Sequence, residues 1–159
     1  KWAAPFVMAA INTKNVHRTN FLLGHPYGKD FRYDEMVLTS PGEAGKKMAE
    51  AAVEMIKNPF GAKPPKPGEG PTPEERENGF YDLMFVGQDK DGKTHTASVS
   101  ASLDPGYGST SRMIAESALC LVENYDTIKG GFYTPAPALG SLLIQRLQEN
   151  AGLTFKIES

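Results

Sequence analysis

Apolar residues recur at three- and four-residue spacing in several segments of the chain, and this spacing places them on one face of a helix. The clearest case is residues 44–56, where alanine, methionine and isoleucine occupy one side and lysine and glutamate the other. The preceding Ser40-Pro41-Gly42-Glu43 has the form of a capping box with Ser40 at the N-cap. The same spacing predicts helices from Asn12 or Thr13 to near Gly24, from about Thr110, and from Pro135 to Gly152 with Thr134 as N-cap.

Other segments alternate with a period of two, which is typical of strands. Two such runs flank an Asp-Gly turn, a pattern that predicts a β-hairpin. The second run of the hairpin is small and polar on one face. The predicted strands are residues 31–39, 80–87, 93–102 and 153–157, and residues 1–11 form an apolar entering strand or loop.

Residues 58–79 hold six of the twelve prolines and four glycines. Proline removes backbone donors and interrupts helices, so we expect a long loop with one short turn at 74–77. Such a loop is a lid, a binding loop, a disordered connection or a linker. The whole pattern predicts one α+β domain over residues 1–159, with an antiparallel or mixed sheet covered on one face by three to four helices.

Composition narrows the class of protein. The chain has 159 residues, 23% of them charged, and a net charge of −2. This balance argues against a nucleic-acid or anionic-membrane surface. No apolar run approaches the roughly 20 residues that span a bilayer. One cysteine forms no intramolecular disulfide, no Cys/His cluster has metal-ligand spacing, and we expect a cytoplasmic protein without a metal site.

The strongest candidate for chemistry is the segment Asp104–Arg112, which leads from a strand into a helix. Its glycines allow a sharp turn, and free amides with hydroxyls at a helix start would suit an anionic group. The alternative is a structural turn with Ser109 or Thr110 as helix cap and Asp104 bonding the turn. The substrate-facing candidates are Asp104, Gly106, Tyr107, Gly108, Ser109, Ser111 and Arg112.

A weaker candidate cluster follows the first predicted helix. His25 and Tyr27 could donate protons, and Arg32 could bind a carboxylate, although surface or packing roles are the alternative. Cys120 lies among apolar residues and is predicted to be a buried, inert thiol.

Several segments, taken in order, resemble the C-terminal part of the saccharopine dehydrogenase-like oxidoreductases, a group that includes trans-acting enoyl reductases. They are Ala-Pro-Phe-Val-Met-Ala at 4–9, Phe-Arg-Tyr at 31–33, residues 67–80, Phe-Val-Gly at 85–87, residues 104–113 and residues 130–136.

In that family an N-terminal Rossmann domain carries the Gly-rich NAD(P) fingerprint. This sequence has no such half and begins at Lys1, so the resemblance implies an excised C-terminal substrate-side or dimerisation domain. Its partners would be the missing Rossmann domain, a second copy in a homodimer and a small-molecule substrate. The fragment would hold no cofactor and be inactive alone, NAD(P) serving the full-length protein. The turn at 104–112 would then face the cofactor cleft, with the Pro-rich loop as a lid. The alternative is a noncatalytic homo-oligomerisation or interaction module.

Overall fold

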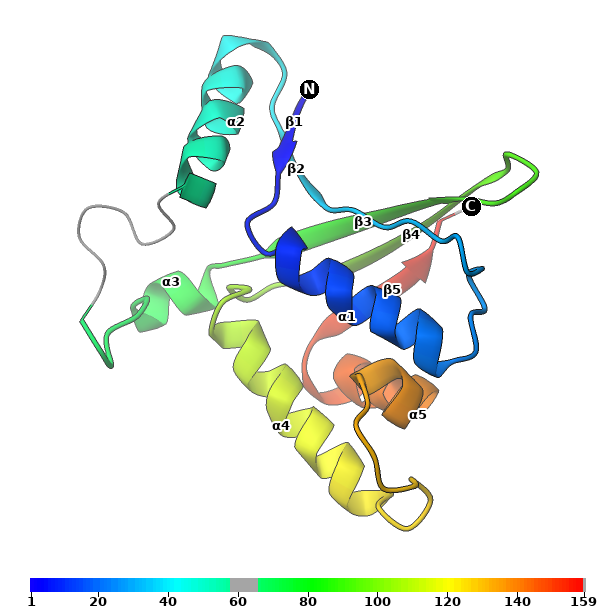
Figure 1. Ribbon diagram of the computed structural model, residues 1–159. Coiled ribbons are helices and arrows are strands. Elements are labelled where there is room, and N and C mark those ends of the chain that lie inside the picture. Colours follow the sequence, from blue (N-terminus) through cyan, green and yellow to red (C-terminus); the bar gives the residue numbers. More distant parts are fainter. Residues whose placement is uncertain (58–65, 159) are drawn as a thin grey trace. The chain divides into compact units, whose positions relative to one another are not determined.

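The computed structural model describes residues 1–57 and 66–158 and has an α+β fold (Figure 1). The described residues form two compact units, Lys1–Glu69 (unit 1) and Gly70–Ser159 (unit 2). Each unit has its own antiparallel sheet, with the order β1-β2 in unit 1 and β3-β4-β5 in unit 2. The prediction of one sheet is therefore wrong in number, although the antiparallel pairing and the α+β class are confirmed. The prediction of a single domain stays a prediction.

Unit 1 consists of a two-stranded sheet and two helices. Strand β1 pairs with β2 from Trp2↔Thr39 to Pro5↔Met36. The elements are β1 (Trp2–Pro5), α1 (Ala9–Leu22), β2 (Met36–Thr39) and α2 (Gly42–Lys57). Helix α1 begins three or four residues before the predicted start, Asn12 or Thr13. It ends close to Gly24, whose φ of 80° suits the left-handed position after a helix.

The strand predicted at 31–39 is shorter in the structure. Only its last four residues form β2, because β1 offers four residues to pair with. The preceding residues bond to α1 and to one another instead. The Asn12 side chain donates to Glu35 Oε2 at 2.9 Å, and the Tyr33 hydroxyl donates to Glu35 Oε1 at 2.8 Å. Burial and this bond to the Glu35 carboxylate raise the pKa of Tyr33 to about 12.

Helix α2 begins at Gly42, so the prediction of Ser40 as its N-cap is wrong. The chain turns at Gly42, whose φ is 77°, and α2 then packs closely on the end of β2. The Thr39 hydroxyl donates to the Gly45 carbonyl at 2.7 Å, and a Cβ at Gly45 would lie 1.7 Å from the Ser40 carbonyl oxygen. This close approach requires glycine and sets where the helix starts.

Unit 2 contains the predicted hairpin. Its elements are α3 (Pro73–Glu77), β3 (Tyr81–Gln88), β4 (Thr94–Ala101), α4 (Gly108–Glu123), α5 (Pro135–Asn150) and β5 (Leu153–Ile157). Of the predicted Pro-rich loop, residues 58–65 lie outside the described residues. The short turn expected at 74–77 is confirmed as α3, which has a capping box between Thr72 and Glu75.

The two faces of the unit 2 sheet differ in character. Side chains from Val99, Ala101, Leu153 and Phe155 point to one face, where they pack with α4 and α5 around the fully buried Cys120 and three leucines of α5, Leu139, Leu143 and Leu147. The register Asp82↔Ser100↔Thr154 places three polar residues together on the opposite face. Helices thus cover one face of this sheet, as predicted, with α4 and α5 in place of the expected three to four helices.

Helices α4 and α5 pack side by side (Figure 1). The half-buried Arg146 of α5 joins them by ion pairs to Glu116, at 2.9 Å, and to Glu123 of α4. Thr134 lies at the N-cap of α5 with Pro135 in the first turn, as predicted. The helical spacing of Leu139, Leu142, Leu143 and Leu147 predicts that all four face inward, but Leu142 is 48% exposed. Across residues 1–57 and 66–158, no helix combines the length and apolar character needed to cross a membrane.

Candidate functional site

The Asp104 turn joins β4 to α4, and its geometry is set by one carboxylate. Asp104 Oδ1 accepts the backbone N–H groups of Gly106 and Tyr107 at 2.9 and 3.0 Å, and Oδ2 accepts that of Gly108. The Asp104 carbonyl also accepts the N–H of Ser109 at 2.9 Å. The chain's own aspartate therefore sits where a helix start attracts an anion.

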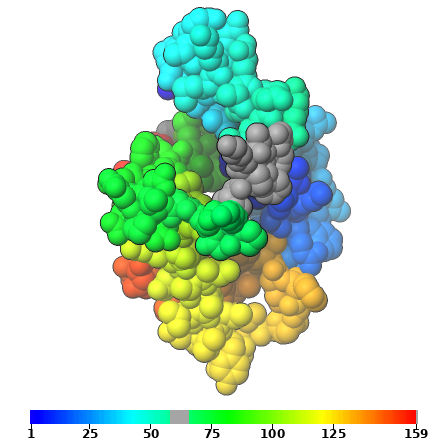
Figure 2. All heavy atoms as spheres, turned by 90° about the vertical axis from the view of Figure 1, so that its left-hand side faces the viewer, coloured from blue at the N-terminus to red at the C-terminus, as the bar shows by residue number. Residues whose placement is uncertain are grey.

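Close backbone contacts require glycine on both sides of this carboxylate. A Cβ at Gly79 would lie 2.4 Å from the Asp104 backbone nitrogen, and one at Gly108 would lie 2.7 Å from Asp104 Oδ2. The Asp104 N–H donates to the Arg76 carbonyl of α3 at 3.0 Å. In the space-filling view, the green α3 segment lies on the surface beside the start of the yellow-green α4 (Figure 2).

The charge state of Asp104 follows from these bonds. Partial burial opposes ionisation, but the N–H groups of Gly108, Tyr107 and Gly106, together with the nearby Arg76 guanidinium, outweigh it and lower the pKa of the Asp104 carboxyl. Asp104 is therefore a charged structural acceptor at neutral pH.

The prediction that the turn offers free amides is wrong, because Asp104 already accepts them. The prediction of Ser109 or Thr110 as the helix cap is also wrong, since α4 begins at Gly108. The stated alternative, Asp104 bonding the turn, is confirmed. Ser109 is fully buried, and its hydroxyl shares a 2.8 Å hydrogen bond with Tyr81.

Some predicted residues of the turn do reach the surface. Tyr107 is 57% exposed, and a Cβ at Gly70 would lie 3.6 Å from its ring, so the ring covers the chain leading into α3. Ser111 and Arg112 are exposed on the first turn of α4, where the Ser111 hydroxyl donates to the Gly108 carbonyl. The outer surface of the turn thus presents a phenol and a guanidinium.

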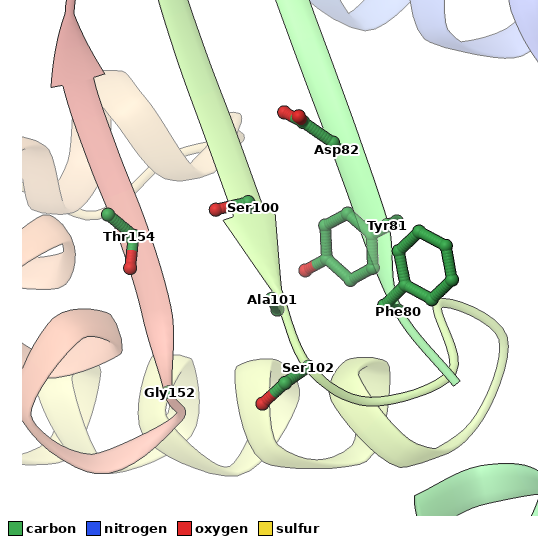
Figure 3. A pocket seen from close by; sticks show the side chains of 8 residues that line it. All are labelled: Phe80, Tyr81, Asp82, Ser100, Ala101, Ser102, Gly152 and Thr154. Atoms are coloured by element: carbon green, nitrogen blue, oxygen red, sulfur yellow. The ribbon is translucent and has the colours of Figure 1, made fainter. Parts of the chain in front are cut away.

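A shallow groove of about 380 Å³ begins beside this turn, on the face of the unit 2 sheet opposite to α4 and α5 (Figure 3). Its polar side chains come from three neighbouring strands and from the residue after β4. Phe80 lies at one end and is largely exposed. The lining residues are Phe80, Tyr81, Asp82, Ser100, Ala101, Ser102, Gly152 and Thr154.

The groove and the Asp104 turn share structure. Tyr81 lines the groove and shares a hydrogen bond with Ser109 at the start of α4. Ser102 lies two residues before Asp104, and Phe80 directly follows Gly79, which packs against the Asp104 backbone. Among the described residues, the side chains of Asp82, Ser100 and Thr154 have no hydrogen-bond partner. The two hydroxyls can donate hydrogen bonds to acceptors of a ligand, and the carboxylate can accept hydrogen bonds from its N–H or O–H groups.

The groove has no motif of its own in the sequence. The polar face of residues 94–102 was its signal, but that face gains meaning only when Asp82 and Thr154 come beside Ser100 from other strands.

The weaker candidates, His25, Tyr27 and Arg32, lie in unit 1. His25 has φ of 64° and packs edge-on against Phe21 with ring centroids 5.7 Å apart. Tyr27 packs against Phe31, and Arg32 is exposed. The buried Asn20 holds this loop, since its side chain donates to the Gly28 carbonyl at 2.8 Å and accepts the Tyr27 N–H at 3.1 Å.

The described residues do not fit a dinucleotide. A Rossmann site needs parallel strands around a helix whose free N-terminal amides meet the pyrophosphate. All strand pairs of the two sheets are antiparallel, and the amides of the Gly-rich turn are bonded to a carboxylate. In the described part of the chain, no three His, Cys, Asp or Glu residues gather where they could hold a metal ion.

The chain is similar to proteins named as trans-acting enoyl reductases. A Mycobacterium tuberculosis protein provisionally given that name is 35% identical over 163 residues, which cover 92% of this chain and 39% of the relative. The trans-acting enoyl reductases of Mycobacterium ulcerans and Mycobacterium bovis are 30% identical over 93% and 92% of the chain and again 39% of their own length. The chain thus spans about two fifths of these relatives. No family model and no solved structure matches it.

Proposed function

We propose that this chain is the substrate-side region of an enoyl reductase-type oxidoreductase whose dinucleotide site lies outside these 159 residues. The similarity over 92% of the chain to proteins named trans-acting enoyl reductases carries the proposal. The poor fit of the described residues to a dinucleotide supports placing NAD(P) elsewhere in the protein. The finer assignment to the saccharopine dehydrogenase-like group, and a cytoplasmic location, stay predictions.

Within this region, the groove on the sheet face opposite to α4 and α5 would contact the substrate. An enoyl group is a carbon–carbon double bond conjugated to a carbonyl, and the carbonyl oxygen accepts hydrogen bonds. The hydroxyls of Ser100 and Thr154 are unpartnered donors on adjacent strands, and Phe80 offers an apolar surface at the end of the groove. The exposed phenol of Tyr107 would approach the substrate from the neighbouring turn, whereas Asp104 keeps the turn in shape.

Cofactor binding tests whether the dinucleotide site lies outside these 159 residues. We expect no binding of NADPH or NADH to the 159-residue chain by calorimetry, and binding with turnover in the longer protein from the same gene. Tight binding by the chain alone would contradict the proposal. Absence of binding by both proteins would favour the alternative, a noncatalytic interaction module.

Two substitutions in the longer protein test the groove. Ser100→Ala should lower kcat/KM for an enoyl substrate about threefold to tenfold, the loss of one hydrogen bond. Thr94→Ala is the matched control, because Thr94 lies on the same face of β4 at the hairpin end, away from the groove. Tyr107→Phe should depress turnover more than cofactor affinity. Equal effects of Ser100→Ala and Thr94→Ala would remove the groove from the substrate site.

A further inference from the structure

Strand β3 is an edge strand of the unit 2 sheet. It pairs with β4 on one side, and on its other side it has no strand partner in the described part of the chain. It is eight residues long and carries apolar side chains on both faces. Leu83 and Phe85 are 48% and 39% exposed on one face, and Met84 and Val86 are 60% and 62% exposed on the other. Long, exposed, apolar edge strands readily pair with another strand.

The hydrogen-bond pattern shows which groups of β3 are free. Antiparallel neighbours alternate between hydrogen-bonded and non-bonded pairs. The Asp89 N–H donates to the Lys93 carbonyl at 2.9 Å, so the odd-numbered residues of β3 bond β4. The N–H and C=O groups of Asp82, Met84, Val86 and Gln88 therefore point to the free edge.

The opposite edge of the sheet is protected in ways that β3 is not. Strand β5 has five residues and carries Lys156 near its end, and short strands and edge lysines discourage pairing. Strand β3 carries one charge, Asp82, close to its start.

We propose that the free edge of β3 pairs antiparallel with β3 of a second copy of this chain, which makes a continuous six-stranded sheet across a two-fold axis. In the register centred on Phe85, Met84 of one copy bonds Val86 of the other. This register sets the two Phe85 rings side by side and Asp82 opposite Gln88, polar against polar. The two Asp82 carboxylates stay at opposite ends of the paired strands, so like charges never meet.

The partner of β3 is a second copy of the chain because β3 is complementary to itself in this register. Apolar residues lie opposite apolar residues, and no charged side chain faces an apolar one. Seven paired residues a side, 82–88, bury an area near the lower limit of specific interfaces. We therefore expect reversible dimers with a dissociation constant on the order of tens of micromolar. This inference does not depend on the proposed enzymatic role.

Sedimentation velocity over a concentration series tests the dimer, with three variants of the 159-residue chain. Val86→Pro removes a free-edge N–H without touching a β3–β4 bond and should weaken association at least tenfold. Val86→Thr keeps the N–H and should leave it unchanged. Ile157→Pro, the matched proline on the free edge of β5, should also leave it unchanged. A dimer that persists in Val86→Pro would overturn the proposal.

Hydrogen exchange on the unmodified chain decides the question even if the proline variant fails to fold. The amides of Met84 and Val86 should gain protection as concentration rises, while those of Leu83 and Phe85 stay protected throughout. Free exchange of Met84 and Val86 at all concentrations would overturn the proposal. Their protection at all concentrations would show that another segment of the same chain covers the edge, which would overturn it equally.

Discussion

Each of the two units is stabilised internally by a different kind of interaction. Unit 2 buries a continuous apolar cluster, in which Cys120, Leu143 and Leu153 lie between the sheet and its two long helices. In unit 1 the buried residues include Asn20 and Thr39, each fixed by specific hydrogen bonds, and Ala4 is the buried apolar residue of that unit within its described residues. Large apolar side chains of unit 1 such as Phe21, Met36 and Met48 are exposed.

This difference shows that amphipathic segments of one chain can be stabilised by apolar burial in one unit and by specific hydrogen bonds in the other. Apolar burial is non-directional and provides most of the free energy of folding in unit 2. Hydrogen bonds each add little net stability but specify one geometry. Unit 1 therefore has a defined backbone with a small apolar core, and we expect its amides to exchange faster than those of the unit 2 sheet.

The largest effect should come from the unit 2 core. Leu143→Ala removes a buried side chain and leaves a cavity, so we expect it to lower the free energy of unfolding by about 3 kcal/mol. Leu142→Ala, one residue away and half exposed, should cost less than about 1 kcal/mol. Urea unfolding of both variants measures the difference. Equal costs would mean that α5 does not pack as described.

In unit 1 the corresponding test removes a polar group. Asn20→Ala leaves the Tyr27 N–H and the Gly28 carbonyl without their partner, and we expect a loss of about 2 kcal/mol. Asn15→Ala, exposed on the same helix, is the control. Hydrogen exchange and limited proteolysis at residues 24–28 report the change. If the control is as costly, the polar network does not hold unit 1 together.

The Asp104 turn predicts a pH dependence confined to unit 2. The pKa of Asp104 is lowered in the folded state, so its contribution is present above the unfolded value of about 4 and is lost as pH falls through the folded value. Asp104→Ala should lower the melting temperature by roughly 5–10 °C at pH 7, and this difference should shrink below about pH 4. Asp82→Ala, exposed and unpartnered, is the control. A difference that stays constant with pH would contradict the role of the charge.

The smallest change in the free energy of unfolding is expected for a capping-box pattern that occurs once in each unit. Thr72-Pro73-Glu74-Glu75 and Ser40-Pro41-Gly42-Glu43 both have the capping-box form, but only Thr72 serves as an N-cap. Thr72→Ala should cost about 1 kcal/mol, and Ser40→Ala should cost less than about 0.5 kcal/mol. Amide exchange at Glu75 and Glu43 separates the two. A larger loss at Ser40 would show that its side chain caps α2 after all.

The elements that the sequence predicted well are those with strong local signals. The hairpin around Asp91-Gly92, helix α5 after Thr134 and the closing strand β5 follow from turn chemistry and periodicity. The strand at 31–39 was predicted too long, because pairing depends on the length of a distant partner, β1. The start of α2 was misplaced, because Gly45 packs against a carbonyl that only the folded chain brings close.

For the candidate site, the sequence identified the Asp104 turn and offered two roles for it. Whether Asp104 fills the helix start or leaves it open depends on hydrogen-bond geometry, and the structure places the carboxylate against three amides. The groove could not be predicted, because Asp82, Ser100 and Thr154 are up to 72 positions apart in the chain. Strand pairing alone makes them neighbours.

The sequence by itself determined which segments become helices and strands, the hairpin and the aspartate of the turn, since these depend on residues within a few positions of one another. The tertiary structure alone decided that there are two sheets and that unit 2 has the larger apolar core. It also decided that the unit 2 sheet carries Asp82, Ser100 and Thr154 on the face away from that core, and that β3 is an edge strand without a strand partner among the described residues. These features arise from contacts between distant segments, whose free energy depends on which partner each segment finds and not on its own pattern.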